Sequence, residues 1–401
     1  MCPLEVIHDV GKARFNLIVK GRESFQNKEG IKIKSTNRLL ALDVFRGMTI
    51  ASMIIVNIPG SWSYVYAPLR HAKWHGCTPT DFIFPFFLFI VGVAMSYSLK
   101  AFENKISLSA TKKILKRVFI IFSIGLILNA FPFNEGFTHL RILGVLQRIA
   151  IAYGIASFFC LYLNSRKLII LSAIILLSYW LLIFLFGQGN PYALDSNLVR
   201  VIDLKLIGEK HLWTGTGIPF DPEGLLSTLP SVVTVIFGYL TGQQIRSKAV
   251  LKQTTYRLFL TGLAAIVTGK IWGIFFPINK SLWTSSFVLY TSGWALIFLT
   301  VLLWIIDIKG YKKWTFPFIV FGTNSLFVYV LSSIWVKIYI YLIKIPKADG
   351  SVTNAYDWIY HSIFEPMAGH MNGSLLFAIA HVFVFWLILL FMYRRKIFIK
   401  I

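Results

Sequence analysis

The segment with the most evident capacity for chemistry is polar and lies between two apolar stretches, at residues 57–81. It contains Asn57, His71 and Asp81 among aromatic, proline and glycine residues. Because a histidine titrates near neutral pH, His71 is the candidate general base or nucleophile. Asp81 opens the second apolar stretch, where a carboxylate also serves as a helix cap favoured by the macrodipole. The sequence is compatible both with a helix-cap role and with a chemical role for Asp81.

The same segment offers two further interpretations. His71 and His75 are four residues apart, so on a helix they would share a face and could bind zinc with Asp81 as a third ligand. Residue 72 is alanine, so the HExxH pattern is absent, and interfacial histidines are the simpler interpretation. Cys77 could form a nucleophilic pair with a histidine, but nothing else in the chain supports a thiol enzyme. We expect no metal.

The hydropathy pattern predicts the scaffold that must position these groups. The 401 residues are 56% hydrophobic and only 14% charged, whereas soluble domains carry roughly 25% charged residues. A spanning helix needs about 20 apolar residues, and lipid offers the backbone no hydrogen-bonding partners. We therefore predict an all-α polytopic membrane protein, a bundle of about ten transmembrane helices near residues 39–58, 81–100, 117–134, 144–164, 168–187, 225–244, 257–276, 284–306, 315–337 and 374–393.

The formal charge of +23 would suit nucleic-acid binding, but the basic residues lie in short runs between apolar stretches. Most of the 40 Lys and Arg fall on one side if both termini are cytoplasmic, as the positive-inside rule requires.

We predict a basic cytoplasmic tail or upstream extension at 1–36, without a secretory signal. A transmembrane domain follows at 37–395, and a cytoplasmic end at 396–401.

Ionisable residues within predicted helices are costly in lipid and usually face a partner or a cavity. Asp43 and Arg46 can pair with each other, or meet an anionic ligand at a cytoplasmic helix start. Arg148 can form a buried ion pair with Asp221 or Glu223 from a long outer loop. The residues in this class are Asp43, Arg46, Arg148 and Lys270.

Several short motifs follow one another along the chain. They are Leu42-Asp43-Val-Phe45-Arg46-Gly47, Asn57, His71-Ala-Lys-Trp74-His-Gly76, Asp81-Phe-Ile-Phe-Pro85, Gly144-Val-Leu-Gln147-Arg148, Phe220-Asp221-Pro-Glu223-Gly224, Asn279-Lys280-Ser-Leu-Trp283 and Gly322-Thr-Asn324-Ser-Leu-Phe-Val-Tyr329. Each is weak alone, but in this order they resemble the heparan-alpha-glucosaminide N-acetyltransferase family over about residues 37–395.

The resemblance implies that residues 37–395 form a transmembrane acyltransferase domain. Family members move acetyl from cytosolic acetyl-CoA to the amine of a terminal glucosamine on the far side of the membrane. His71 matches the family's active-site histidine and Asn57 the asparagine that accompanies it, whereas His75 lies outside the pattern. His71 would act as a base or carry the acetyl group itself, and the sequence does not choose between these routes. Asn57 could stabilise the oxyanion.

The matched positions also suggest which residues bind the substrates. Acidic side chains could hold the cationic amine or the hydroxyls of an amino sugar, and tryptophans could stack on its ring. The expected acceptor-binding residues are Asp81, Asp221, Glu223, Trp74, Asn279, Lys280 and Trp283. The expected residues for acetyl-CoA, the co-substrate, are Arg46, Gln147, Arg148 and Asn324.

Animal lysosomal members carry an additional lumenal domain and helix that are absent from this sequence. The chain therefore resembles a bacterial relative in the inner membrane, with its active site opening to the periplasm. The expected partners are the bilayer, an amino-sugar or oligosaccharide acceptor and a second copy in a homodimer, but no nucleic acid. The alternative function is a transporter or flippase for a glycan or lipid-linked sugar, which ten helices with buried charges suit equally well.

Overall fold

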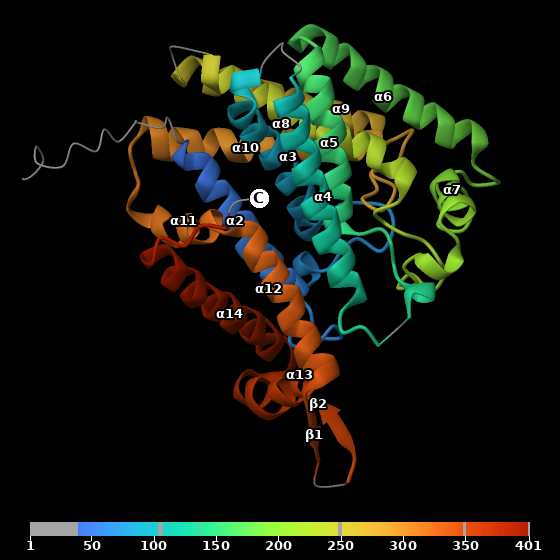
Figure 1. The fold of residues 1–401 in the computed structure, drawn as a ribbon, viewed down its shortest axis with the longest axis vertical. Coiled ribbons are helices and arrows are strands. Elements are labelled where there is room, and N and C mark those ends of the chain that lie inside the picture. Colours follow the sequence, from blue (N-terminus) through green and yellow to red (C-terminus); the bar gives the residue numbers. More distant parts are fainter. Residues whose placement is uncertain (1–38, 103–106, 135, 248–250, 348–349, 400–401) are drawn as a thin grey trace, which may run out of the picture. The chain divides into compact units, whose positions relative to one another are not determined.

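The computed structural model describes residues 39–102, 107–134, 136–247, 251–347 and 350–399, and residues 40–401 form one compact unit. The predicted tail at 1–36 and the last two residues lie outside the described part. The long helices in Figure 1 are α2 (Leu40–Asn57), α3 (Ile83–Ser98), α4 (Leu108–Ala130), α5 (Val145–Tyr162), α6 (Ser165–Phe186), α8 (Leu225–Ser247), α9 (Leu251–Trp272), α10 (Ser285–Leu302), α12 (Ser325–Lys337) and α14 (Glu365–Arg394). The short elements are α7 (Leu198–Leu206), α11 (Phe316–Thr323), α13 (Ala355–Ile359) and an antiparallel hairpin of β1 (Lys344–Pro346) and β2 (Val352–Asn354).

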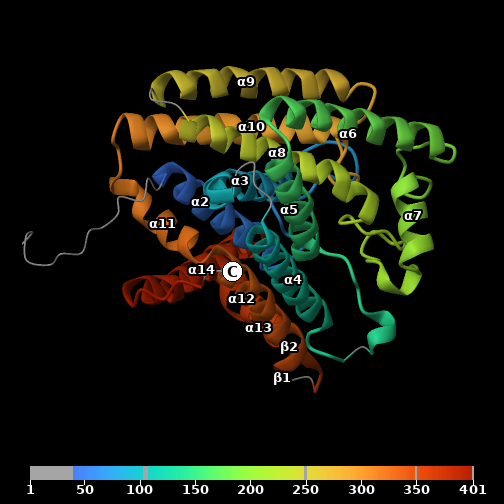
Figure 2. The same ribbon diagram turned by 45° about the horizontal axis from the view of Figure 1, so that its top comes forward.

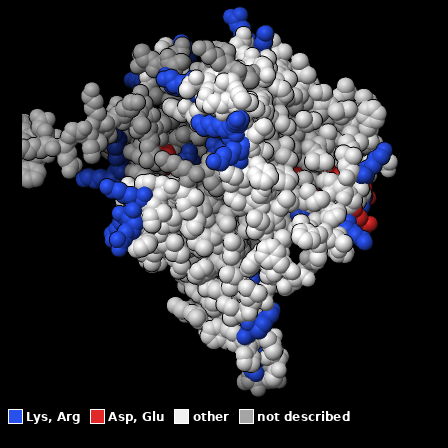
Figure 3. Space-filling view, in the orientation of Figure 1, with Lys and Arg blue, Asp and Glu red and all other residues white. Residues whose placement is uncertain are grey.

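The predicted all-α polytopic membrane fold is confirmed. In the part of the chain that the structure describes, eight helical segments are long and apolar enough to cross a membrane. Helix α6 exposes Ile170, Ile174 and Leu181 along its length, as a helix facing lipid does. On the face seen in Figure 3 most described residues are uncharged, and the Lys and Arg side chains visible there lie in a few small groups.

The helix boundaries differ from the predictions where polar residues interrupt the hydropathy signal. Helix α4 begins at Leu108 rather than near 117, because the Ser107 side chain accepts a hydrogen bond from the Ala110 N–H and caps a basic first half. The predicted helix at 315–337 is broken at Asn324, whose φ of −126° and ψ of 44° separate α11 from α12. This break matters for the second cavity described below.

Helices α3 and α8 form the centre of the bundle, with α4 and α5 on one side and α2 on the other, while α9 packs on α10 (Figure 2). A Cβ at Gly92 would lie 2.0 Å from the Val235 carbonyl oxygen, and one at Gly238 would lie 2.1 Å from that of Phe89. Only glycine permits so close an approach of two helix backbones, which is how small residues support membrane helix packing. The contact fixes α3, whose N-terminal end carries Asp81.

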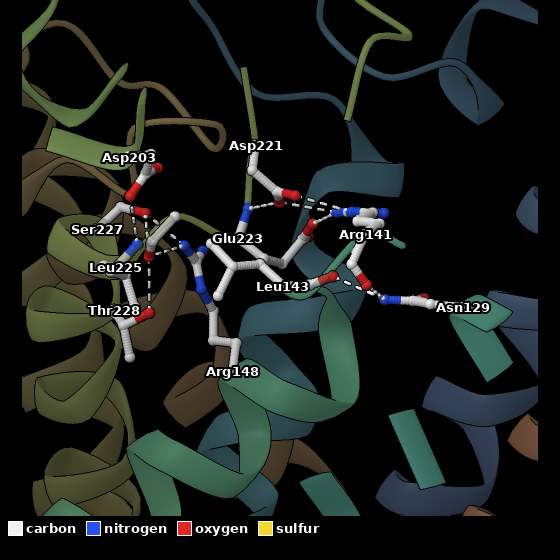
Figure 4. A network of polar contacts seen from close by, with 11 residues as sticks. Asn129, Arg141, Leu143, Arg148, Asp203, Asp221, Glu223, Leu225, Ser227 and Thr228 are labelled. Carbon is white, nitrogen blue, oxygen red and sulfur yellow. Dashed lines mark hydrogen bonds and ion pairs between the residues drawn. The ribbon is translucent and has the colours of Figure 1, made fainter. Parts of the chain in front are cut away.

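Helix α7 is joined to the start of α8 by a buried carboxylate (Figure 4). Asp203 is fully buried, and its Oδ1 accepts a hydrogen bond from the Leu225 N–H at 3.0 Å. Its Oδ2 has no hydrogen-bond partner among the described residues. Burial raises the pKa of Asp203 to about 7; the nearby Asp221 adds to the rise, and the Leu225 N–H and Arg148 oppose it.

We predict that Asp203→Asn stabilises the protein more in alkaline than in acidic buffer. Because the folded-state pKa lies above the unfolded value, the neutral carboxyl is favoured in the fold. Its contribution to stability, on the order of a few kcal/mol, is complete below about pH 4 and lost as the pH rises through about 7. The asparagine keeps the acceptor for Leu225 and has no charge to bury. Thermal unfolding in detergent at pH 5 and pH 8 measures this.

The variant should unfold at a higher temperature than the wild type at pH 8, and by a clearly smaller margin at pH 5, where only part of the contribution of the neutral carboxyl is lost. Asp195→Asn is the matched control, because Asp195 is exposed in the same loop region. Equal unfolding midpoints for the wild type and Asp203→Asn at pH 8 would refute the raised pKa of Asp203.

Candidate active site

A cavity of about 640 Å³ lies where the C-terminal end of α2 meets the N-terminal ends of α3 and α5 and the adjoining loops. We call it the active-site cavity. Of the predicted site residues, its lining includes Asn57, His71, Trp74, Asp81, Glu223 and Lys280. The other predicted positions do not line it; they are Asp221, Asn279, Trp283, Arg46, Gln147, Arg148 and Asn324.

The buried carboxylate of Asp81 holds the imidazole of His71. Asp81 Oδ1 lies 2.6 Å from His71 Nδ1, and the exposed fractions of the two side chains are 1% and 47%. Asp81 Oδ2 accepts hydrogen bonds from the N–H groups of Ala72 and Thr78 and from the Thr78 hydroxyl. From this contact we infer the tautomer with hydrogen on Nδ1, which leaves Nε2 as an available base.

The helix-cap role of Asp81 is present as well. A 3₁₀ helix, Pro79–Phe82, leads into α3, and Thr78 and Asp81 form a reciprocal capping box at its start. The preceding loop is not helical, so His71 and His75 do not share a helix face. His75 instead lies 3.4 Å from the Asn279 side-chain nitrogen. No group of three or more His, Cys, Asp and Glu residues in the described part of the chain could hold a metal ion.

Lys280 brings a cation to the His71–Asp81 pair. Its Nζ lies 3.1 Å from His71 Nδ1, 3.5 Å from His71 Nε2 and 3.6 Å from Asp81 Oδ1. Burial lowers the pKa of Lys280, while the charges of Asp81 and Glu223 oppose that shift. The ammonium is therefore placed to stabilise negative charge that develops close to the imidazole.

Asn279 and Trp283 form the support beneath Lys280. Both are almost completely buried, and Asn279 Oδ1 accepts a hydrogen bond from the Leu282 N–H at 2.8 Å. Trp283 has a positive φ of 50° and packs its ring 5.1 Å from the guanidinium of Arg148. Since Trp283 is 1% exposed and lies outside the cavity, the expectation that it stacks on a sugar has no geometric support.

Arg141 was not predicted, yet it organises the acidic part of the cavity (Figure 4). Its guanidinium binds Asp221 through two contacts of 2.8 Å and Glu223 through one of 2.7 Å. The Asn129 side chain donates to the carbonyl oxygens of Arg141 and Leu143, which holds this loop in place. The only signal in the sequence is that Arg141 is the sole Arg or Lys between residues 131 and 147.

The predicted ion pair between Arg148 and Asp221 or Glu223 is wrong at the level of direct contact. Arg148 is buried in α5 and donates instead to the Gly224 carbonyl oxygen at 3.2 Å and to the Ser227 hydroxyl. Arg141, on the loop before α5, binds both carboxylates, whereas Arg148 of α5 contacts the start of α8. Asp221 is fully buried by this pairing, and only Glu223 of the two acids lines the cavity.

Cys77 is not equipped for nucleophilic chemistry. Burial, assisted by the charge of Asp81, raises the pKa of Cys77 to about 12, against a smaller opposing effect of Lys280. The thiolate is the nucleophilic form of cysteine, and it is scarce at neutral pH under these conditions. His71 is therefore the better placed nucleophile or base of the two.

A second cavity, of about 240 Å³, lies toward the opposite ends of the same helices and contains Arg46 and Arg117. Arg117 stacks 4.6 Å from the Tyr153 ring, and its buried Nε has no hydrogen-bond partner among the described residues. Arg46 contacts Asp43 at 3.3 Å and the Gly322 carbonyl oxygen at 3.4 Å. Two guanidinium groups in one hollow suit an anionic ligand such as a phosphate.

The remaining predicted co-substrate residues lie around this second cavity or away from it. Asn324 donates to the Ile397 carbonyl oxygen and accepts from the Ile399 N–H, so it fastens the C-terminal segment beside the cavity. Gln147 is 1% exposed, packs against Gly125 and lines neither cavity. Arg117 was not predicted, because it ends a basic run whose evident meaning in the sequence is the orientation of the helix.

Comparisons with known proteins agree with the motifs. A family model described as "Heparan-alpha-glucosaminide N-acetyltransferase, catalytic" matches residues 38–267. The mouse heparan-alpha-glucosaminide N-acetyltransferase is 30% identical over 354 residues, covering 74% of this chain and 53% of the relative. The human protein is 30% identical over 353 residues, covering 73% and 52% respectively. The chain thus spans about half the length of the curated relatives it matches, and it belongs to the heparan-alpha-glucosaminide N-acetyltransferase family.

Proposed function

We propose that this protein transfers an acetyl group across the membrane, from acetyl-CoA at the second cavity to the amine of a glucosamine-type sugar in the active-site cavity. The observation that carries the proposal is the His71–Asp81 pair, with Lys280 beside it, in a cavity large enough for a sugar. The family supports an acetyltransferase, because the matched relatives bear that name.

The donor fits the second cavity by charge. Coenzyme A carries phosphates, and Arg46 of α2 and Arg117 of α4 supply cations to this cavity. Arg46 and Asn57 lie on one helix eleven residues apart, which is about 16 Å at the helical rise per residue. A long thioester arm bound at the arginines can therefore reach the His71 end of α2.

The chain's own residues account for the transfer. His71 Nε2 accepts a proton from the acceptor amine as its nitrogen attacks the thioester carbonyl carbon. Asn57, whose side chain has no hydrogen bond among the described residues, donates to the developing oxyanion, and Lys280 stabilises the charge. The C–S bond breaks as the C–N bond forms, and the proton passes from His71 to the departing sulfur. The products are an N-acetyl sugar and the free thiol.

A second route uses the same groups in two steps. His71 Nε2 attacks the thioester first, the thiol departs, and the acetyl group rests on the imidazole until the amine displaces it. Asp81 orients the ring in either route. Labelled acetyl that remains bound to protein after incubation with acetyl-CoA alone, and is lost in His71→Ala, identifies the two-step route; its absence identifies direct transfer.

The acceptor faces aromatic and acidic groups. Trp74 is fixed by a hydrogen bond from its indole N–H to the Tyr192 carbonyl oxygen at 2.8 Å, and its ring contributes to the cavity wall. Trp213 forms another part of the wall, next to Arg141. A rigid aromatic ring suits the apolar face of a sugar, and the Glu223 carboxylate suits its ammonium group.

The arrangement also supports an orientation. Basic residues gather toward the second-cavity end, where α4 begins and α8 ends, so the positive-inside rule assigns that end to the cytoplasm. Both termini would then be cytoplasmic, and His71 would face the opposite side. In a bacterial inner membrane that side is the periplasm, where an amino sugar or oligosaccharide would be the acceptor.

We predict that His71→Ala lowers acetyl transfer from acetyl-CoA to glucosamine by about 10²- to 10⁴-fold, because it removes the base or acetyl carrier. Asp81→Asn should also lower the rate, because an amide cannot hold the imidazole in the required tautomer. Rates are measured in proteoliposomes with purified protein, and folding is checked by size-exclusion chromatography.

His75→Ala is the matched control, since His75 lies four residues away and outside the cavity. Transfer by His71→Ala at the wild-type rate would exclude the proposed chemistry. If the wild type shows no transfer but moves glucosamine conjugates across the bilayer without acetyl-CoA, the transporter alternative is the function.

For the donor site, we predict that Arg117→Ala weakens acetyl-CoA binding by about tenfold or more, the loss expected for one charge-assisted contact. Calorimetry on detergent-purified protein measures the dissociation constant, and higher salt should narrow the difference. Lys116→Ala is the control, because Lys116 is exposed and outside the cavity. Equal weakening by the two variants would place the phosphates elsewhere.

A further inference from the structure

The active-site cavity and the second cavity share part of their walls. The residues common to both are Phe87 of α3, Ile149 of α5 and Leu326 of α12. All three are apolar, whereas the charged groups lie on either side, with His71 and Lys280 in one cavity and Arg117 in the other.

Along each of these helices, residues on one side of the shared residue line the active-site cavity, and residues on its other side line the second cavity. On α3, Phe84 lines the active-site cavity and Val91 the second cavity, one turn to either side of Phe87. On α5, Leu146 and Tyr153 flank Ile149 in the same way. The agreement of separate helices shows that the shared residues lie at one level of the bundle.

The same order holds on α12, which runs in the reverse sense: Ser325 lines the second cavity and Tyr329 the active-site cavity, with Leu326 between them. Ile149 is 5% exposed and belongs to the main apolar core, and Phe87 and Leu326 pack against that core. Side chains held in a packed core keep their positions, so the wall that the two cavities share is well defined.

We propose that Phe87, Ile149 and Leu326 form a constriction through which the donor's acyl group must pass, and that it selects acyl groups by cross-section. The inference rests on the proposed function. The acyl group is the tip of the thioester arm, so it enters the constriction ahead of the arm. An unbranched acyl chain is no wider than the arm that follows it. A group branched beside the carbonyl is wider and meets all three side chains.

The constriction also separates water at the two ends of the bundle. His71 is 47% exposed on one side, and Arg46 is 21% exposed on the other, so solvent reaches both cavities. A narrow apolar passage excludes water and keeps such cavities from joining into a conducting path. Enlarging the constriction should therefore produce a leak that needs neither donor nor acceptor.

The test compares butyryl-CoA with its branched isomer isobutyryl-CoA, with acetyl-CoA as the reference and glucosamine as the acceptor, in proteoliposomes. The wild type should use butyryl-CoA in strong preference to isobutyryl-CoA. Phe87→Ala should reduce that preference by about tenfold, the size of effect that a methyl group has in an apolar pocket. Leu326→Ala serves as a second variant if Phe87→Ala fails to fold.

Phe86→Ala is the matched control. Phe86 is adjacent on α3 but lines neither cavity, and its ring packs 5.3 Å from that of Phe45. Its removal should leave the ratio of the isomers unchanged. An unchanged ratio in both Phe87→Ala and Leu326→Ala, with acetyl transfer retained, overturns the proposal.

A proton-leak measurement separates this proposal from the proposed function. Liposomes that contain a pH-sensitive dye receive a pH step without any substrate. Faster equilibration with Phe87→Ala than with the wild type and Phe86→Ala supports the constriction, and equal rates in all three overturn it. If the wild type transfers no acetyl, the proposed function fails, and the leak measurement alone decides on the constriction.

Discussion

The buried carboxylate of Asp81 joins the scaffold of this protein to its chemistry. A charge withdrawn from water is costly unless hydrogen bonds and opposite charges compensate for it. Asp81 meets that requirement with the N–H groups of Ala72 and Thr78, the Thr78 hydroxyl, the His71 imidazole and the nearby ammonium of Lys280. The loop before α3, the start of α3 and the loop before α10 must therefore all be in place together. The bonds that hold these segments also orient the imidazole of His71.

The acidic side of the cavity obeys the same constraint. Asp221 is completely buried and is satisfied by two contacts to Arg141, which also binds Glu223. Breaking such a pair leaves an uncompensated charge, so the loop that carries Arg141 and the loop that carries Asp221 are coupled. Glu223 keeps its place on the cavity wall through this pairing. The Arg141 guanidinium therefore couples the two loops and also holds the Glu223 carboxylate on the cavity wall.

The proposed transfer across the membrane requires two cavities that meet without merging. The helices satisfy this by carrying polar groups at both ends and apolar groups between them, so that α3 and α5 each line both cavities. The break at Asn324 lies beside the second cavity, where its side-chain amide binds the C-terminal segment. Close packing of α3 on α8 through Gly92 and Gly238 keeps the walls of both cavities in register.

Much of this protein could be predicted from the sequence, because the signals involved are local. Apolar stretches of spanning length located the helices, and the alternation of basic runs indicated an orientation. The order of motifs identified the family and selected His71, Asn57 and Asp81, all of which line one cavity. The polar beginning of α4 escaped detection, since hydropathy measures only the apolar part of a helix.

The tertiary structure alone decided which charged groups meet. The sequence suggested that Arg148 binds Asp221 or Glu223, whereas Arg141 binds both. It suggested that Trp283 and Asn279 face a substrate, whereas they are buried beneath Lys280. The sequence contained no sign that Phe87, Ile149 and Leu326 line both cavities. Composition and spacing specify a helix and the type of residue it carries, but its rotation and the reach of each loop are set by long-range packing. Charge pairing falls off over a few ångströms, so small differences in that packing choose the partners.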